Sequence, residues 1–241
     1  MQFLEDKVAL ITGGSKGIGF GIAEALMWQG INVGITARSK SAAAEAAGKL
    51  NDMNKGKAKA IGIQADVRNY KQQEKAVQQV LEKFGKLDIL IANAGLGHFA
   101  PVDELSLEQW QETIDTNLTG VFYSIKAAVE ELKKTKGYII TISSLAGTNF
   151  FANGSAYNAS KFGVTGFTQA AMLDLRKYEI KVTTIMPGSV ATYFNNHTPD
   201  GNDDWKIQIE DLGAMVVDLL RMHPRTLPSK IEVRPLLPPG K

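Results

Sequence analysis

Residues 8–19 read Val-Ala-Leu-Ile-Thr-Gly-Gly-Ser-Lys-Gly-Ile-Gly, and this stretch decides the fold. The apolar run Val8–Thr12 predicts a buried strand, and the periodic segment Ile18–Gln29 predicts a helix. The glycines between them allow a tight turn and a close approach of backbone to a ligand. A strand, a glycine-rich turn and a helix start place free N–H groups where they bind phosphate. The stretch therefore predicts a dinucleotide-binding unit.

The same alternation of strand and helix continues along the chain. Apolar runs that predict strands covered on both faces are Val8–Thr12, Val33–Ala37, Ala58–Gln64, Ile89–Ala92, Tyr138–Ser143, Val182–Met186 and Ile231–Val233. Helices are predicted at Ile18–Gln29, Ser41–Met53, Tyr70–Phe84, Leu107–Lys134 (with Ser106 and Gln109 as a capping box), Ala156–Tyr178 and Ile209–Met222. We therefore expect an α/β, Rossmann-like, doubly wound parallel sheet of about seven strands with helices on both faces.

Length and spacing indicate one domain. The chain has 241 residues, and residues 1–241 are predicted to form a single dinucleotide-binding catalytic domain because nothing resembles a linker or a repeat. The least regular stretch, Tyr193–Lys206, is rich in Asn, Asp, His, Pro and Gly. Residues 189–206 are therefore a candidate substrate loop, although a mobile solvent loop has the same composition. The tail from Pro235 is expected to be extended.

Composition excludes several classes of protein. The chain has no cysteine, which excludes a disulfide scaffold, a thiolate metal site and a cysteine nucleophile. A net charge of +2 without a basic tract argues against nucleic acid as a partner. Apolar runs are too short for a membrane span, and the polar N-terminus does not resemble a secretory signal. We expect a cytoplasmic protein.

The end of the second predicted strand indicates the kind of nicotinamide cofactor. An acidic residue there would bind the ribose 2′-hydroxyl of NAD, whereas an arginine accommodates the 2′-phosphate of NADP. This chain has Ala37-Arg38 and no acid at that position, and Lys16 in the glycine turn adds a second cation. The sequence therefore favours NADP(H). A nucleotide triphosphatase is excluded because no Gly-Lys pair is followed by Ser or Thr.

A candidate proton donor follows the fifth predicted strand. Tyr157 and Lys161 are one helical turn apart, so a phenol and an ammonium share one helix face. The ammonium is expected to lower the pKa of Tyr157 below about 10, which would favour proton exchange near neutral pH. The spacing alone arises easily by chance. Its position after the predicted strand Tyr138–Ser143 matters more, because ligands bind beyond the carboxyl ends of such strands. Ser144 at the end of that strand could reach the same cleft, or could simply cap a helix.

Other catalytic chemistries have little support. A Ser-His-Asp site has little support, because the chain has only His98, His197 and His223 and no G-x-S-x-G elbow. The same scattered histidines and the lack of an H-E-x-x-H motif predict that there is no metal site. His98 could line a pocket, but its sequence context is also typical of a surface loop.

Taken together, the residues resemble the short-chain dehydrogenase/reductase family over nearly the whole chain. The matching motifs, in order, are Thr12-Gly13-x-x-x-Gly17-Ile18-Gly19, Asp66-Val67, Asn93-Ala94-Gly95, Thr116-Asn117-Leu118, Ser144, Tyr157 with Lys161, and Pro187-Gly188-x-Val190-x-Thr192. Two features depart from the family pattern: Ala92 replaces a frequent asparagine, and the segment Lys230–Pro235 lacks the Gly-Gly ending of many 3-oxoacyl-carrier-protein reductases. The ending looks more like that of sepiapterin-type and broad-range carbonyl reductases.

The resemblance implies roles for individual residues. Tyr157 would be the general acid or base, Ser144 would bind the substrate oxygen, Lys161 would hold the nicotinamide ribose, and Asn117 would support Lys161 through a water-linked proton relay. Cofactor contacts are implied for Gly13, Ser15, Lys16, Gly17, Ile18, Gly19, Arg38, Asp66, Val67, Asn93, Ala94, Gly95, Tyr157, Lys161, Pro187, Gly188, Val190 and Thr192.

The favoured hypothesis is an NADP(H)-dependent oxidoreductase for a small-molecule carbonyl/alcohol pair. A 3-oxoacyl-carrier-protein reductase is a narrower alternative, and a non-catalytic NADP-sensing regulator is an alternative of another class. Apolar residues on the predicted helices Leu107–Lys134 and Ala156–Tyr178 are Ile114, Phe122, Ile125, Phe162, Phe167 and Met172. The family commonly assembles through these helices, so a homodimer or homotetramer is expected, although the core could bury the same residues.

Overall fold

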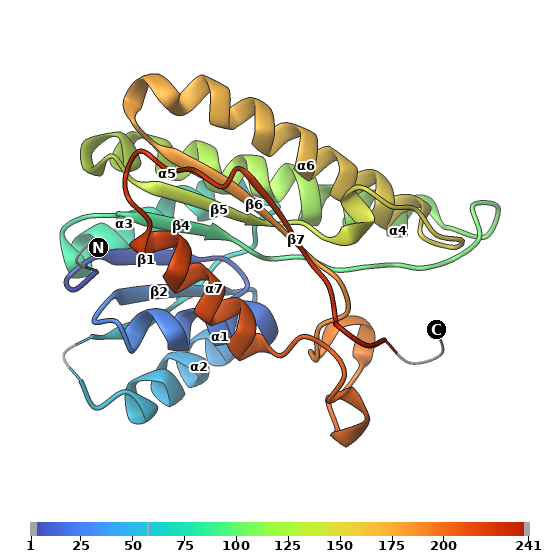
Figure 1. Cartoon of the computed structure of the whole chain (residues 1–241), viewed down its shortest axis with the longest axis horizontal. Helices are drawn as coiled ribbons and strands as arrows, with labels where there is room; N and C mark the ends of the chain where they lie inside the picture. The colour runs from blue at the N-terminus through green and yellow to red at the C-terminus, as the bar shows by residue number, and fades with distance from the viewer. Residues whose placement is uncertain (1–3, 57, 239–241) are drawn as a thin grey trace.

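The computed structural model describes residues 4–56 and 58–238. In this part of the chain seven strands form one sheet in the order β3-β2-β1-β4-β5-β6-β7, and every neighbouring pair is parallel (Figure 1). The strands are β1 (Val8–Ile11), β2 (Asn32–Ala37), β3 (Ala60–Gln64), β4 (Ile89–Ala92), β5 (Tyr138–Ile142), β6 (Lys181–Pro187) and β7 (Lys230–Val233). The predicted Rossmann-like α/β sheet is confirmed.

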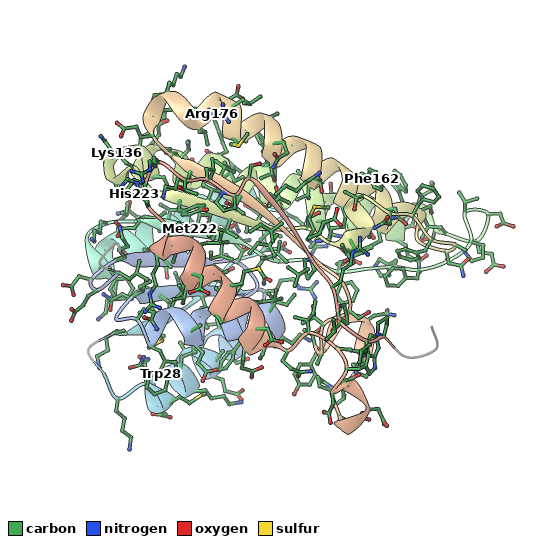
Figure 2. The ribbon with its side chains drawn as sticks, in the orientation of Figure 1. Trp28, Lys136, Phe162, Arg176, Met222 and His223 are labelled. Carbon is green, nitrogen blue, oxygen red and sulfur yellow. The ribbon has the colours of Figure 1, made fainter. Side chains whose placement is uncertain are left out.

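Helices cover both faces of the sheet (Figure 1). The α-helices of the described residues are α1 (Gly17–Met27), α2 (Lys40–Met53), α3 (Tyr70–Phe84), α4 (Leu107–Ile114), α5 (Gly120–Thr135), α6 (Ser155–Leu175) and α7 (Ile209–Arg221). Helices α1, α2 and α7 enclose one apolar core, and α3, α5 and α6 enclose another on the opposite face. Figure 2 accordingly places Trp28, next to α1, and Phe162, on α6, at opposite sides of the molecule.

The two edge strands differ from the predicted pattern. The sequence predicts strands covered on both faces, but β3 buries only Ala60 and Ile63 and β7 has no fully buried residue. Both strands have a neighbour on one side only, so helices cover them less completely. The inner strands β1, β4 and β5 are buried at every residue, as predicted.

The predicted helix Leu107–Lys134 is interrupted. Its capping box is confirmed, because Ser106 Oγ accepts from the Gln109 N–H and the Gln109 side chain accepts from the Ser106 N–H. After α4, however, residues Asp115–Thr119 form a π-helical turn before α5 begins. Such turns are frequent at functional sites. This one contains Asn117.

The order of the strands locates the ligand-binding edge. The chain moves outward from β1 to β2 and β3, then crosses back to β4 on the other side of β1. In open α/β sheets, ligands bind beyond the carboxyl ends of the strands at this reversal. The segments after β1, β4, β5 and β6 lie at that edge because the strands are parallel. Within the described residues we find no helix long and apolar enough to cross a membrane.

Candidate active site

The glycine turn, Gly13–Gly19, links β1 to α1 and has a conformation that requires glycine at several positions. Gly13 and Gly17 have φ angles of +64° and +58°, in the left-handed region that side chains disfavour. A Cβ added at Gly19 would lie 2.6 Å from Asn93 Nδ2 and 2.7 Å from the Gly13 carbonyl oxygen. The turn is therefore fixed by close backbone packing as well as by dihedral angle.

Side chains from β1 and the β4 end hold this turn in place. Asn93 Nδ2 donates to the carbonyl oxygens of Thr12 (2.9 Å) and Gly13 (3.1 Å). Thr12 Oγ1 accepts from the backbone N–H groups of Asn93 (3.0 Å) and Ala94 (3.1 Å). The predicted site residues Asn93 and Ala94 thus join the two strands on either side of the strand-order reversal. Sequence reasoning gave Thr12 only as part of a motif and missed this bracing role.

The turn fits a dinucleotide. Helix α1 begins at Gly17, and its N-cap residue Lys16 makes no side-chain capping bond, so the first helical N–H groups are available to a phosphate. Ser15 is half-buried and Lys16 is exposed in the same turn. Across the turn, a Cβ added at Gly17 would come no closer than 3.5 Å to Thr192, its nearest neighbour. Backbone donors at the start of α1, with the exposed Lys16 beside them, match what a pyrophosphate needs.

The predicted 2′-phosphate residue lies in a charged network that the sequence did not indicate. Arg38 is exposed, and its guanidinium is 3.8 Å from the Glu112 carboxylate of α4. Glu112 also pairs with Arg68 at 3.2 Å, and Arg68 pairs with Asp66 at 2.7 Å. Hydrogen bonds from Arg68 outweigh partial burial and hold the pKa of Asp66 below its usual value. An acid is therefore present near Arg38, supplied by a distant helix and shared with Arg68.

Tyr157 lies near the start of α6, beside Ser144 at the end of β5. The predicted lowering of its pKa is wrong for this structure: burial raises the pKa of Tyr157, and the hydrogen bond with Ser144 opposes that rise only partly. Ser144 Oγ also accepts from the Ala146 N–H at 3.1 Å. The ammonium of Lys161 lies 5.6 Å from the centre of the tyrosine ring.

Lys161 is buried at 5% exposure, one turn after Tyr157 on α6. Its Nζ donates to the Ile142 carbonyl oxygen at 3.0 Å. Burial lowers the pKa of Lys161 to about 8. A Cβ added at Gly95 would lie 3.6 Å from Lys161 Nζ and 3.3 Å from Asn117 Oδ1, so glycine at this position leaves room where the two side chains converge.

Asn117 has no exposed surface and is held on three sides. Its Oδ1 accepts from the Leu96 N–H at 2.9 Å, and its Nδ2 donates to the Leu96 carbonyl at 2.8 Å. Nδ2 also donates to Ser160 Oγ at 3.0 Å, next to Lys161 on α6. The π-helical turn therefore positions Asn117 between the segment after β4 and α6. Ser160 was not predicted, since its partner is distant in sequence.

The segment after β6 lies against the other candidate residues. Ser144 Oγ is 3.4 Å from the Pro187 carbonyl oxygen, and the Gly188 N–H donates to the Val233 carbonyl of β7 at 2.8 Å. Val190 bridges to Ile207, and Thr192 Oγ1 accepts from the Phe194 N–H at 3.3 Å. Thr192 is also the nearest neighbour of a Cβ added at Gly17, and the Phe194 ring contacts that of Tyr157, so residues 187–194 lie between the glycine turn and Tyr157.

Three phenylalanines that the sequence did not single out form a cluster beside Tyr157, two of them in contact with its ring. The ring centres of Phe99 and Phe194 lie 5.4 Å and 5.6 Å from that of Tyr157, and Phe151 lies 5.9 Å from Phe99. They come from the segments after β4, β5 and β6. We call Phe99, Phe151 and Phe194 the phenyl cluster. Only their position in the fold unites them, so no sequence motif could have found them.

The histidines lie apart from a common centre. His98 Nε2 is 2.9 Å from the Glu112 carboxylate, and His197 pairs with Asp203 within the segment after β6. Across the described ranges 4–56 and 58–238, no three His, Cys, Asp or Glu side chains gather in a way that could hold a metal ion.

Comparison with known proteins agrees with this arrangement. The sequence profile of the short chain dehydrogenase family matches residues 7–203, so the chain belongs to the short-chain dehydrogenase/reductase family. It is an oxidoreductase family; a short chain dehydrogenase from Burkholderia cenocepacia (30% identical) was solved with NADP and a carveol dehydrogenase from Mycobacterium avium (25% identical) with NAD.

The relatives that the chain resembles are named for different substrates. The chain is 40% identical over 190 residues to a trans-4-hydroxycyclohexanecarboxylate dehydrogenase of Sinomonas cyclohexanicum (78% of this chain, 73% of the relative). It is 38% identical over 193 residues to a 3-oxoacyl-[acyl-carrier-protein] reductase of Synechocystis (80% and 77%). An alcohol dehydrogenase from Thermococcus sibiricus, solved with 5-hydroxy-NADP, superposes with a TM-score of 0.89 at 28% identity and covers 98% of this chain and 99% of its own.

Proposed function

We propose that the protein is an NADP(H)-dependent oxidoreductase that interconverts a small-molecule carbonyl and its alcohol, with Tyr157 as general acid in the reducing direction. The observation that carries the proposal is the convergence of Ser144, Tyr157, Lys161 and Asn117 beside the glycine turn. The names of the relatives, two dehydrogenases and a reductase, support a carbonyl/alcohol reaction.

In this proposal the bound nicotinamide supplies the hydride, and the protein orients the reactants. The glycine turn and the start of α1 would hold the pyrophosphate, and Arg38 with Lys16 would hold the 2′-phosphate. Lys161 would hold the nicotinamide ribose. The segment 187–192 would close against the nicotinamide, and the whole chain would act as one catalytic domain with residues 189–206 over the substrate.

The protons are handled by side chains on α6 and β5. Ser144 donates a hydrogen bond to the substrate oxygen and holds it next to the Tyr157 hydroxyl. A phenol with a raised pKa remains protonated at neutral pH, so Tyr157 is ready to donate a proton to the oxygen as negative charge develops there. Lys161 stabilises the phenolate that is left, and Asn117 fixes the geometry around Lys161.

The test is NADPH oxidation with a panel of aldehydes and ketones, comparing the wild type with Tyr157→Phe. General acid catalysis contributes about 10²- to 10⁴-fold, so kcat is expected to fall by that factor. Binding of NADPH, measured by fluorescence titration, should be retained because the ring of Tyr157 is kept. Equal turnover by the two proteins would refute the mechanism. Tight NADPH binding without turnover of any carbonyl would instead favour a cofactor-sensing regulator.

A 3-oxoacyl-carrier-protein reductase is a second candidate, supported by the Synechocystis relative. Reduction of acetoacetyl thioesters by the wild type distinguishes it: this candidate requires kcat/KM for the carrier-protein thioester to exceed that for simple ketones.

We also propose that the chain forms a homodimer or homotetramer through the face of α5 and α6. Of the six apolar residues predicted there, Phe122 and Phe162 are 45% and 44% exposed, whereas Ile125 and Met172 are in the core. Exposed aromatic residues are typical of association surfaces. Light scattering of the wild type and of Phe162→Glu tests this proposal, because the variant should have a smaller molar mass in solution.

A further inference from the structure

We propose that the phenyl cluster is the substrate-recognition wall of this site and that it selects carbonyl compounds carrying a six-membered ring over open-chain compounds of the same carbon count. This inference rests on the proposed function and names the substrate class of the same site.

The cluster is an exposed apolar surface around the candidate proton donor. Phe99, Phe151 and Phe194 are 36%, 49% and 37% exposed, although each is a large apolar side chain. Apolar side chains that remain exposed together are characteristic of binding surfaces. Because they gather around Tyr157, a ligand that covers them also meets the phenol.

Ring contacts connect Phe99 and Phe194 directly to Tyr157, and Phe151 through Phe99. Phe99 is the centre of the arrangement, with ring centres 5.4 Å from Tyr157, 5.9 Å from Phe151 and 6.2 Å from Phe194. These separations lie in the range of about 4.5–7 Å in which aromatic rings attract each other in tilted and edge-to-face geometry. The wall therefore favours a flat or compact ring.

The wall itself shows how a six-membered ring packs beside Tyr157. Phe194 belongs to the segment 189–206, and its ring contacts both Tyr157 and Phe99. Gly97 makes room for this contact, since a Cβ there would lie 2.7 Å from the Phe99 ring and 2.8 Å from the Phe194 ring. The surface formed by Tyr157 and Phe99 thus packs against a ring of this size, and a substrate ring would pack against the same aromatic surface beside Phe194.

Charge recognition contributes little to this wall. In the part of the chain that the structure describes, cations lie over the rings of tyrosines and a tryptophan but over none of the three phenylalanines. His98, the ionisable neighbour of Phe99 in sequence, pairs with Glu112. Selection by the cluster is therefore based on shape and apolar contact.

The first test is the ratio of kcat/KM for cyclohexanone to that for 2-hexanone, two ketones of equal carbon number. The wild type should prefer cyclohexanone, and Phe99→Leu should lower the ratio about three- to fivefold, since the smaller side chain covers roughly one methylene less of the ring's apolar surface. Phe99→Tyr, which keeps the ring, should retain the wild-type ratio. The effect should be mainly on KM. A uniform loss for both ketones, or an unchanged ratio, would overturn the inference.

The matched control is Phe150→Ala against Phe151→Ala. Phe150 is 86% exposed and makes none of the ring contacts of the cluster, whereas Phe151 contacts Phe99. Truncation of Phe151 should lower the cyclohexanone preference, and truncation of Phe150 should leave it unchanged. Equal effects of the two truncations would count against the cluster.

A binding measurement separates this inference from the proposed function. An alcohol and NADPH cannot react with each other, so the Kd of cyclohexanol and of 2-hexanol for the protein–NADPH complex can be measured by fluorescence. Tighter binding of cyclohexanol that weakens in Phe99→Leu supports the wall even if no ketone is reduced, a result that would overturn only the proposed function. Equal binding of the two alcohols would overturn the wall even if ketones are reduced.

Discussion

The glycine turn and the phenyl cluster lie at the same edge of one sheet, but they are built differently. The turn is fixed by backbone conformation, by Asn93 and by glycines that leave no space for a Cβ. The cluster consists of partly exposed side chains on three loops that meet only in the folded protein. Under the proposed function, a cofactor common to the family would explain the first kind of site, and a substrate particular to this protein would explain the second.

The largest expected effect concerns Lys161, which lies where the two regions meet. Its pKa in the folded state is about 8, below the value of 10.5 expected in the unfolded chain. Below pH 8 both states are protonated and the full cost of burying the charge is present. Between about pH 8 and 10.5 the unfolded state binds more protons, so stability should rise with pH by up to roughly 3 kcal/mol.

The measurement is urea unfolding of the wild type and of Lys161→Met at pH 7.5, 9 and 10.5. The difference in the free energy of unfolding between the two proteins should shift in favour of the wild type as pH rises. Parallel pH dependences would show that Lys161 is not buried as a charged group.

The next effect concerns the cofactor side alone. Arg38→Asp should weaken NADP(H) and shift the preference toward NAD(H) by about 10- to 100-fold, because a charge-assisted hydrogen bond contributes about 1.5–3 kcal/mol. Arg225→Asp, an equal charge change at an exposed position between α7 and β7, is the control. The comparison is the ratio of kcat/KM values for NADPH and NADH. If Arg38→Asp leaves this ratio unchanged, Arg38 does not bind the cofactor.

A pair of glycine substitutions tests the contrast in packing. Gly19→Ala lies within α1, where alanine normally stabilises, but its Cβ would meet Asn93 and the Gly13 carbonyl. We expect about 1–3 kcal/mol of destabilisation, as for other overpacked sites, with weakened cofactor binding. Gly201→Ala, in the segment 189–206, meets no atom within 4 Å and should change neither quantity. Thermal unfolding measures stability, and NADPH titration measures cofactor affinity. Equal effects of Gly19→Ala and Gly201→Ala on these two quantities would contradict the prediction.

The smallest effect concerns Glu112. Its carboxylate lies 3.8 Å from Arg38 and opposes a phosphate bound there. Glu112→Gln should tighten NADP(H) about two- to fivefold and leave NAD(H) unchanged, which is the scale of exposed charge pairs. Titrations at low and high salt check this, since the gain should shrink with salt. Tightening of both cofactors alike would point to a structural effect.

The sequence predicted the turn well and the cluster poorly for a physical reason. Glycine positions and strand ends are local properties, so Gly13–Gly19 could be assigned from the chain alone. The π-helical turn at Asp115–Thr119 depends on bonds from Asn117 to Leu96 and Ser160, which are distant in sequence. The raised pKa of Tyr157 depends on burial in the folded chain. Such tertiary effects leave no periodic signal in the sequence.

The charged network shows the same limit. No acid follows β2 in the sequence, yet α4 brings Glu112 to Arg38. Local reasoning could identify Arg38 but not the carboxylate that competes for it. The structure therefore adds Glu112 to the prediction for Arg38, as a carboxylate that would weaken phosphate binding there.

The most direct test of the central claim follows the hydride itself. NADPH carrying two deuterium atoms at C4 of the nicotinamide is incubated with the wild type and cyclohexanone, and the alcohol is analysed by mass spectrometry. The account predicts one deuterium in each alcohol molecule, bound to the carbinol carbon, and about 10²- to 10⁴-fold slower labelling by Tyr157→Phe. Cyclohexanol without deuterium, or equal labelling by the two proteins, would contradict it.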